Sequence, residues 1–213
     1  MLKLVYLAKR KPGFAFDDFV RRWRMHGARG MEGSFWRHAL AYVQAEPLRP
    51  TPVAGTSEAF DAIAIFAVRD DAFAAMTPDD IAGAKTMAQD ELETFSAPIP
   101  TTALWVDEER LLDGEFGGIA AYLFFADEVS ARAAAALALA SGALHRIVVN
   151  RRRDAGPFGP QADTLPYGAI VELAASSVDA LTSALGAGNA GLVAAADVAV
   201  ITREVVFWDR RAT

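Results

Sequence analysis

The residues with the clearest potential for chemistry lie in the segment FVRRWRMHGARG, residues 19–30. It holds four arginines, a tryptophan and His26, which is one of only three histidines in the chain. A free imidazole titrates near about pH 6.5, so it can give or take a proton under ordinary conditions. His26 is therefore the first candidate for a general acid or base. The competing interpretation is a histidine at a helix C-terminus that binds the last carbonyls.

Tyr42 and His38 form a second candidate pair on a predicted strand, residues 38–45. Side chains four residues apart on a strand point to the same face. If that face lines a cavity, His38 can contact a substrate and the Tyr42 phenol can donate to a developing oxyanion. A core tyrosine whose hydroxyl is satisfied by the protein is the alternative.

The arginines near His26 divide into two groups. Arg24 and Arg29 can hold a carboxylate or an enolate through charge-assisted hydrogen bonds. Arg21 and Arg22 are expected on the solvent side, paired four residues apart with the two aspartates of the first helical turn.

Two further side chains complete the candidate site. Trp23 lies on the apolar face of its predicted helix, where it either packs in the core or forms a flat cavity wall for an aromatic ligand. Asp90 belongs to a predicted helix, residues 78–95. It is either an exposed helical carboxylate or the group that orients a catalytic histidine.

Several functional classes are disfavoured by composition. The chain has no cysteine, which excludes disulfides, thiolate metal sites and cysteine nucleophiles and fits a cytoplasmic protein. His26 and His38 lack metal-ligand spacing, and no dinucleotide fingerprint follows a strand, so we expect neither a metal nor a cofactor. The net charge of −6 argues against nucleic-acid binding, and the basic run at 151–154 reads as a solvated strand end. No apolar run is long enough to span a membrane.

Hydrophobic periodicity predicts the order β-α-β-β-α-β, which is the ferredoxin-like unit, and then the same order again. The helix that carries His26 is expected to stop at Gly27. FDAIAIF resembles YGAIVEL later in the chain, and LWVDEER resembles VFWDRR, which supports an internal repeat. The second half is shorter in the region that corresponds to WRMHG. A loop rich in glycine and proline is expected at 154–166. Two short helices, separated by the glycines near residue 186, are expected before the last strand. The predicted fold is α+β: tandem ferredoxin-like units, 1–112 and 113–213, forming a pseudo-dimeric α/β barrel.

The N-terminal half resembles the EthD family of dimeric α/β-barrel proteins. The resemblance rests on KLVYLAKRKPG, AYVQ, FDAIAIF, the acidic pair Asp90-Glu91, and a helix motif made by Phe19, Trp23, His26 and Gly27. It implies a ligand cavity between sheet and helices. Most such barrels are homodimers, whereas a tandem repeat implies that one chain makes its own barrel, as a monomer or within a homodimer. Related barrels cyclise, dehydrate or decarboxylate aromatic polyketides, perform cofactor-free monooxygenation, or degrade haem.

The leading hypothesis is a cofactor-independent, EthD-type enzyme that acts on a small aromatic or polyketide-like molecule. It would transfer a proton at His26, as a lyase, cyclase or dehydratase does, with Tyr42 or Asp90 assisting. Trp23, Arg24 and His38 are the expected substrate-binding residues. One alternative is a non-catalytic barrel that binds a small molecule. Another is a structural protein whose cavity is filled by its own side chains.

Overall fold

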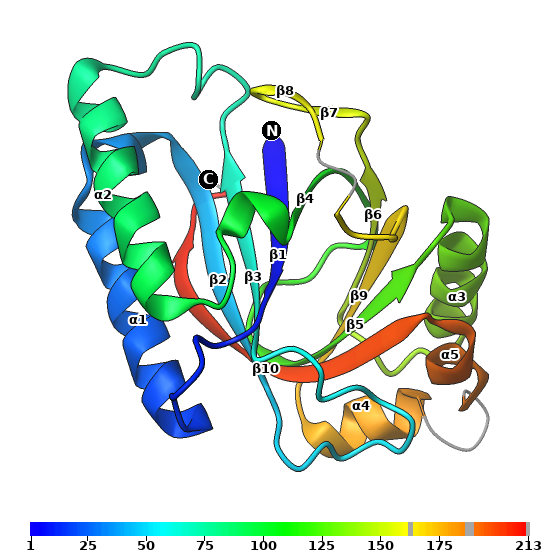
Figure 1. The fold of residues 1–213 in the computed structure, drawn as a ribbon. Coiled ribbons are helices and arrows are strands. Elements are labelled where there is room, and N and C mark those ends of the chain that lie inside the picture. Colours follow the sequence, from blue (N-terminus) through cyan, green and yellow to red (C-terminus); the bar gives the residue numbers. More distant parts are fainter. Residues whose placement is uncertain (162–163, 186–189, 212–213) are drawn as a thin grey trace.

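Eight antiparallel strands close into a barrel, with helices packed on two opposite sides (Figure 1). The structure is a computed structural model that describes residues 1–161, 164–185 and 190–211. The first half contains β1 (Leu2–Ala8), α1 (Phe16–Glu32), the 3₁₀ helix η1 (Ser34–His38), β2 (Ala39–Pro47), β3 (Ala62–Val68), α2 (Pro78–Thr94), the 3₁₀ helix η2 (Ile99–Thr101) and β4 (Ala103–Leu112). The second half contains β5 (Gly118–Phe125), α3 (Glu128–Ala140), β6 (Arg146–Arg152), β7 (Ala155–Gly156), β8 (Gly159–Pro160), β9 (Ala169–Ala175), α4 (Val178–Leu185), α5 (Ala190–Ala195) and β10 (Val198–Asp209).

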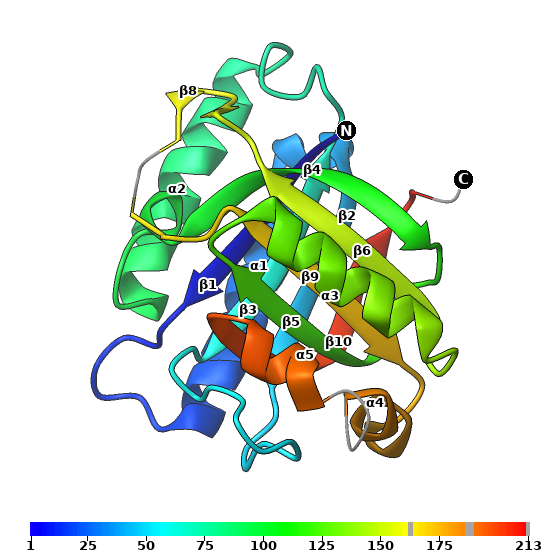
Figure 2. The same ribbon diagram turned by 90° about the vertical axis from the view of Figure 1, so that its right-hand side faces the viewer.

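The strands follow one another around the barrel in the order β1-β3-β2-β10-β5-β9-β6-β4. Among the described residues, strands of the two halves meet at two seams, where β2 pairs with β10 and β4 pairs with β6. Helices α1 and α2 cover one side of the barrel, and α3, α4 and α5 lie on the other (Figure 1). Figure 2 shows α3 lying over the strands of the second half. The α+β barrel predicted from the sequence is confirmed at this level.

The interior of the barrel is packed with its own side chains. Alternate residues of the strands point inward and form one buried apolar cluster, which includes Val5, Val43, Ile65, Leu104 and Phe124. The outward residues of the first half pack against α1 and α2, and those of the second half pack against α3, α4 and α5. Any larger space must therefore lie between a sheet and its helices.

Charged side chains are also buried inside the barrel. Lys3 Nζ lies 2.5 Å from Glu108 Oε2 and 2.6 Å from Glu172 Oε1. The Arg146 guanidinium pairs with Glu204, which also accepts a 2.6 Å hydrogen bond from the hydroxyl of Tyr122. Charges taken out of water are stable only when paired and hydrogen-bonded, so these ion pairs fix which strands face one another across the lumen.

Three local expectations are corrected by the structure. Helix α1 continues past Gly27 to Glu32, because Gly27 is a contact position on the helix and not its end. His38 belongs to η1 and precedes β2, so it shares no strand face with Tyr42. The loop expected at 154–166 contains the two-stranded hairpin β7–β8. The glycine-rich stretch 186–189, expected to separate two helices, lies outside the described residues.

None of the helices in the described part of the chain has both the length and the apolar character needed to cross a membrane.

Candidate functional site

A cleft of about 1190 Å³ opens between the outer face of the first-half sheet and helices α1 and α2. It corresponds to the kind of cavity that the resemblance implied. Strands β1 to β4 contribute the floor through Leu4, Tyr6, Tyr42, Phe66 and Trp105, and the two helices contribute the walls. Its size exceeds the usual range of about 300–1,000 Å³ for small-molecule pockets, so it can take a ligand of several rings.

His26 and Asp90 meet in the wall of this cleft. The Nδ1 atom of His26 lies 2.7 Å from Oδ2 of Asp90, although the residues are 64 positions apart in the chain. Both side chains are buried, with 8% of His26 and 6% of Asp90 exposed. The ring of His26 also meets Phe95 edge to face, at 5.3 Å between ring centres. These contacts fix the orientation of the imidazole.

Two arginines share the same carboxylate. Arg22 donates to both oxygens of Asp90, at 3.0 and 2.7 Å, and Arg29 also donates to Oδ1. The sequence suggested that Arg21 and Arg22 both face solvent and pair with the first-turn aspartates. Arg22 does not, whereas Arg21 pairs with Asp18. Burial would raise the pKa of Asp90, but the hydrogen bonds from Arg22 and His26 outweigh it and hold that pKa well below its usual range.

The ionised state of Asp90 assigns the proton positions on His26. A carboxylate only accepts hydrogen bonds, so Nδ1 carries the hydrogen that faces Asp90. In the neutral ring, Nε2 then keeps its lone pair. No described residue makes a hydrogen bond to Nε2, while His26 lines the cleft. Burial lowers the pKa of His26; Asp90 opposes this shift, and Arg22 and Arg29 add to it. The neutral, proton-accepting form is therefore favoured near neutral pH.

Two tyrosine hydroxyls lie on the floor of the cleft. Tyr6 Oη accepts a 2.8 Å hydrogen bond from Nε1 of Trp23, and Tyr42 Oη accepts one of 2.8 Å from Nε2 of Gln44. Burial raises the pKa of both phenols, so both stay protonated. A protonated phenol held in place by its neighbours can donate to an oxygen that becomes negative.

Gly27 lets helix α1 approach this floor closely. A Cβ atom at Gly27 would lie 2.7 Å from Nε2 of Gln44 and 2.9 Å from the hydroxyl of Tyr42. Both distances are too short for non-bonded carbon, and both neighbours are buried. The Gly27-Tyr42-Gln44 contact thus sets the spacing between helix and sheet, and with it the position of His26 next to it in sequence.

Replacing Gly27 with alanine should therefore destabilise the protein despite the better helix propensity of alanine. Overpacking of a buried contact costs about 1–3 kcal/mol, against a gain of about 1 kcal/mol in propensity. Urea denaturation should show a lower midpoint for Gly27→Ala. The matched control is Gly83→Ala in α2, where a Cβ meets nothing within 4 Å and the midpoint should rise. Equal rises in both variants would contradict the close contact.

The candidate residues predicted from the sequence divide into two groups. His26, Tyr42, Asp90 and Arg29 line the cleft. Trp23 and Arg24 are not among its lining residues: Trp23 is fully buried and stacks on Phe19 in the core behind it. Arg24 donates to Gln44 at 2.9 Å and to Glu46 at 2.7 Å, so its charge is engaged on the side of the helix away from the cleft lining.

His38 is also absent from the cleft lining. It is buried beside Phe35, and its Nδ1 lies 2.9 Å from Nη2 of Arg69. The 3₁₀ turn directs it toward the loop after β3, which explains why the strand-based expectation placed it wrongly.

Several lining residues were not singled out by sequence reasoning. Tyr6 shares the floor with Tyr42. Gln44, two residues from Tyr42 on β2, does not line the cleft itself but holds that tyrosine in place. Their spacing on the strands was the available signal, since i and i+2 share a face. Glu91 also lines the cleft, and burial raises its pKa, while a 3.2 Å hydrogen bond from the Ile99 amide opposes the shift.

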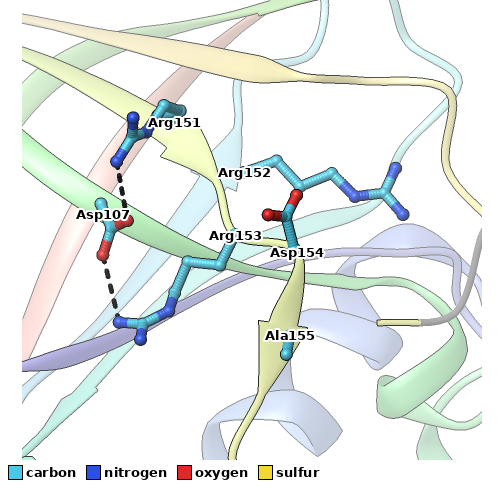
Figure 3. Close-up of a pocket in the computed structure, with 6 residues that line it drawn as sticks. All are labelled: Asp107, Arg151, Arg152, Arg153, Asp154 and Ala155. Carbon is cyan, nitrogen blue, oxygen red and sulfur yellow. Dashed lines mark hydrogen bonds and ion pairs between the residues drawn. The ribbon is translucent and has the colours of Figure 1, made fainter. Parts of the chain in front are cut away.

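A second, smaller hollow lies at the basic run that was expected to be a solvated strand end (Figure 3). Figure 3 shows Asp107 between Arg151 and Arg153, each 3.1 Å from one of its oxygens. Arg152 points away from Asp107 and donates to the carbonyl of Leu165. The run is thus occupied by ion pairs within the protein, in keeping with a structural role.

Solved structures share this architecture at very low sequence identity. An anthrone oxidase-like protein matches with a TM-score of 0.54 and 11% identity over 100% of this chain and 95% of its own. A candidate monooxygenase from Fusobacterium nucleatum subsp. nucleatum matches with a TM-score of 0.54 and 8% identity, over 96% of this chain and 91% of its own. A candidate chlorite dismutase, TA0507, matches with a TM-score of 0.51 and 12% identity, over 96% of this chain and 94% of its own.

No family model matches the sequence, and no curated protein matches it either. Sequence identities this low show a shared fold and nothing about activity. The closed barrel, its flanking helices and these likenesses together show that the chain shares the overall fold of these solved structures.

Proposed function

We propose that the protein is a cofactor-independent enzyme that transfers a proton to and from a small aromatic or polyketide-like molecule bound in the cleft. The observation that carries this proposal is the His26–Asp90 pair in the cleft wall, with Nε2 of His26 left without a protein partner among the described residues. A histidine oriented by a carboxylate is the usual arrangement of a general base.

The proposed step begins with the substrate in the cleft and a neutral His26. Nε2 removes a proton from an acidic C–H or O–H group, and Asp90 stabilises the imidazolium that forms. The negative charge moves to a substrate oxygen, where the hydroxyl of Tyr42 donates a hydrogen bond and Arg29 supplies positive charge. Return of the proton to another carbon of the substrate would give an isomer. Delivery of the proton to a hydroxyl group as its C–O bond breaks would release water, as in a dehydratase, which is a lyase. Attack of the enolate carbon on a carbonyl of the same molecule, with the proton passed to the new alkoxide, would give a cyclase outcome.

We also propose that the chain is EthD-type and consists of two tandem ferredoxin-like units, 1–112 and 113–213. The strand order supports the tandem arrangement: β4-β1-β3-β2 in the first half has its counterpart in β10-β5-β9-β6 in the second. One chain then supplies both halves of a barrel, as a monomer or as part of a homodimer. The absence of cysteine fits a cytoplasmic location.

Two observations favour an enzyme over the other candidate functions. A purely structural barrel would have its cavity filled, whereas the cleft retains about 1190 Å³. A passive binding protein has no need of a buried histidine held by a carboxylate and flanked by two arginines. The binding protein remains an outcome of the test.

The test is hydrogen–deuterium exchange into anthrone, a three-ring enolisable ketone, chosen because one structural neighbour is described as anthrone oxidase-like. The wild-type protein in D₂O should raise the exchange rate at the acidic CH₂ above the rate in buffer, as mass spectrometry would show. Anthrone that binds without faster exchange would make this chain a binding protein. If anthrone neither binds nor exchanges faster, the enzyme and the binding-protein hypotheses are both ruled out.

The rate of this exchange should depend on pH through His26. Its folded pKa lies below the ordinary value of about 6.5, so the neutral base is present at pH 7 and is lost as pH falls through the folded pKa. The enzyme-dependent rate, after subtraction of the buffer rate, should be level near neutrality and fall only below about pH 6.5. An acid limb centred above that value would contradict a buried, arginine-flanked histidine as the base.

A further inference from the structure

We propose that the hairpin β7–β8, contributed by the second half of the chain, completes the first-half cleft as an aromatic clamp for planar polycyclic substrates. In this clamp, Phe158 at the hairpin tip and Phe73 from the loop after β3 hold the ring of the substrate that lies farthest from His26. The inference rests on the proposed function, because it assigns the substrate class of the same site.

The hairpin lies beside the cleft as an added wall. Its residues Gly156, Phe158, Gly159, Pro160 and Gln161 line the cleft together with residues of α1 and α2. Figures 1 and 2 show the hairpin projecting from the second-half sheet toward the α2 side of the barrel. A segment of the second half thus reaches across the β4–β6 seam into the site of the first half.

The hairpin is anchored to β4 by the side chain of Gln161. Its Oε1 accepts a 2.8 Å hydrogen bond from the amide of Trp105, and its Nε2 donates a 2.8 Å hydrogen bond to the carbonyl of the same residue. Nε2 also lies 2.5 Å from the carbonyl of Arg153 at the base of the hairpin. The amide side chain thereby acts as a short piece of strand and fixes the hairpin on the edge of the cleft.

Close packing on the Trp105 ring fixes the other strand of the hairpin. A Cβ atom at Gly156 would lie 2.5 Å from Cδ1 of Trp105 and 2.8 Å from its Nε1. Only glycine allows the hairpin backbone to lie directly against the indole at this position. The hairpin therefore has a defined place over the floor of the cleft.

The tip of the hairpin carries an aromatic ring with little cover. Phe158 is 79% exposed, yet its ring meets Phe73 edge to face at 4.9 Å between ring centres. Phe73 in turn meets Trp105 edge to face at 5.6 Å. An exposed phenylalanine anchored at the rim of a cleft and aligned with two further rings has the character of a binding surface.

The cleft combines polar and flat apolar surface, as a polycyclic ligand with one acidic group requires. His26, Asp90 and Arg29 are among its polar lining residues, while Phe73, Trp105 and Phe158 supply flat apolar surface. The volume of about 1190 Å³ is well beyond the need of one ring. A planar molecule of several fused rings can place its acidic group at His26 and pack its far ring against Phe158 and Phe73.

The experiment compares the binding of phenol and 2-hydroxyanthracene by calorimetry to the wild type, Phe158→Ala and Phe73→Ala. Edge-to-face aromatic contacts contribute about 0.5–1.5 kcal/mol beyond burial, which corresponds to a change in Kd of roughly 2- to 12-fold. Each variant should weaken the binding of 2-hydroxyanthracene by about this factor and leave the binding of phenol within about 2-fold. Val129→Ala is the matched control, since Val129 is also 79% exposed but lies on α3.

The clamp would be overturned if the variants weakened the binding of phenol and 2-hydroxyanthracene equally, or weakened neither. It would also be overturned if the wild type did not bind 2-hydroxyanthracene more tightly than phenol. Gly156→Ala, which displaces the hairpin without removing a ring, should reproduce the selective loss. The proposed function is judged separately, by the rate of hydrogen–deuterium exchange into anthrone in a His26 variant. Loss of exchange in a His26 variant together with unchanged ring preference in Phe158→Ala would leave the enzyme and remove the clamp. The reverse pattern would leave the clamp and remove the enzyme.

Discussion

Replacing His26 with glutamine should lower the protein-dependent rate of anthrone exchange by about 10²- to 10⁴-fold, the usual contribution of a positioned general base. Glutamine can still donate a hydrogen bond to Asp90, so the carboxylate keeps a partner where His26 stood at 2.7 Å. It cannot accept a proton at neutral pH. The effect should therefore appear in the rate of exchange, measured by mass spectrometry, with little change in the affinity for anthrone.

The control for this prediction is His145→Gln, because His145 precedes β6 and is not among the residues that line the cleft. That variant should exchange anthrone at the wild-type rate. Circular dichroism of both variants would show whether the fold is kept. Undiminished exchange in a folded His26→Gln protein would show that another group, such as Glu91 in the same cleft, is the base.

The largest loss of stability is expected from Arg146→Met inside the barrel. Arg146 is 1% exposed and pairs with Glu204, and its Nη2 also lies 3.8 Å from Glu172. The substitution leaves the Glu204 carboxylate in the lumen with no guanidinium beside it. Removing one partner of a buried ion pair costs about 3–5 kcal/mol. Guanidinium denaturation should show this as a fall in the free energy of unfolding.

Two comparisons make the result specific to the buried pair. Arg132→Met on the surface, which removes ion pairs to Glu109 and Glu128, should leave the denaturation midpoint nearly unchanged because exposed pairs contribute little. The double variant Arg146→Met/Glu204→Leu should recover part of the loss, because the Glu204 carboxylate is removed as well and Glu172 keeps its ion pair with Lys3. Equal midpoints for the two single variants would show that the lumen pair is not a stabilising element.

Much of the fold could be predicted because its signals are local. Strand alternation in FDAIAIF and the apolar face formed by Phe19 and Trp23 define the elements and their buried sides. Tyr42 could be placed near a cavity for the same reason. The packing role of Trp23 was the ordinary outcome of its helical spacing.

The chemistry of the site depended on contacts that local patterns do not contain. The pairing of His26 with Asp90 joins α1 to α2 across 64 residues, and Arg22 binds the same carboxylate instead of a first-turn aspartate. Gly27 was interpreted as a stop signal because its close approach to Gln44 exists only after helix and sheet have docked. His38 was misplaced because a 3₁₀ turn before a strand has no strong sequence signature.

The place of β10 in the barrel has a consequence for how the chain is made. β10 lies between β2 and β5, so each of these strands has an unpaired edge until residues 198–209 have left the ribosome. Exposed strand edges are templates for pairing with other chains. The nascent first half is thus prone to misassociation before β10 is made, and slowing translation of the residues just before β10 would lengthen that interval.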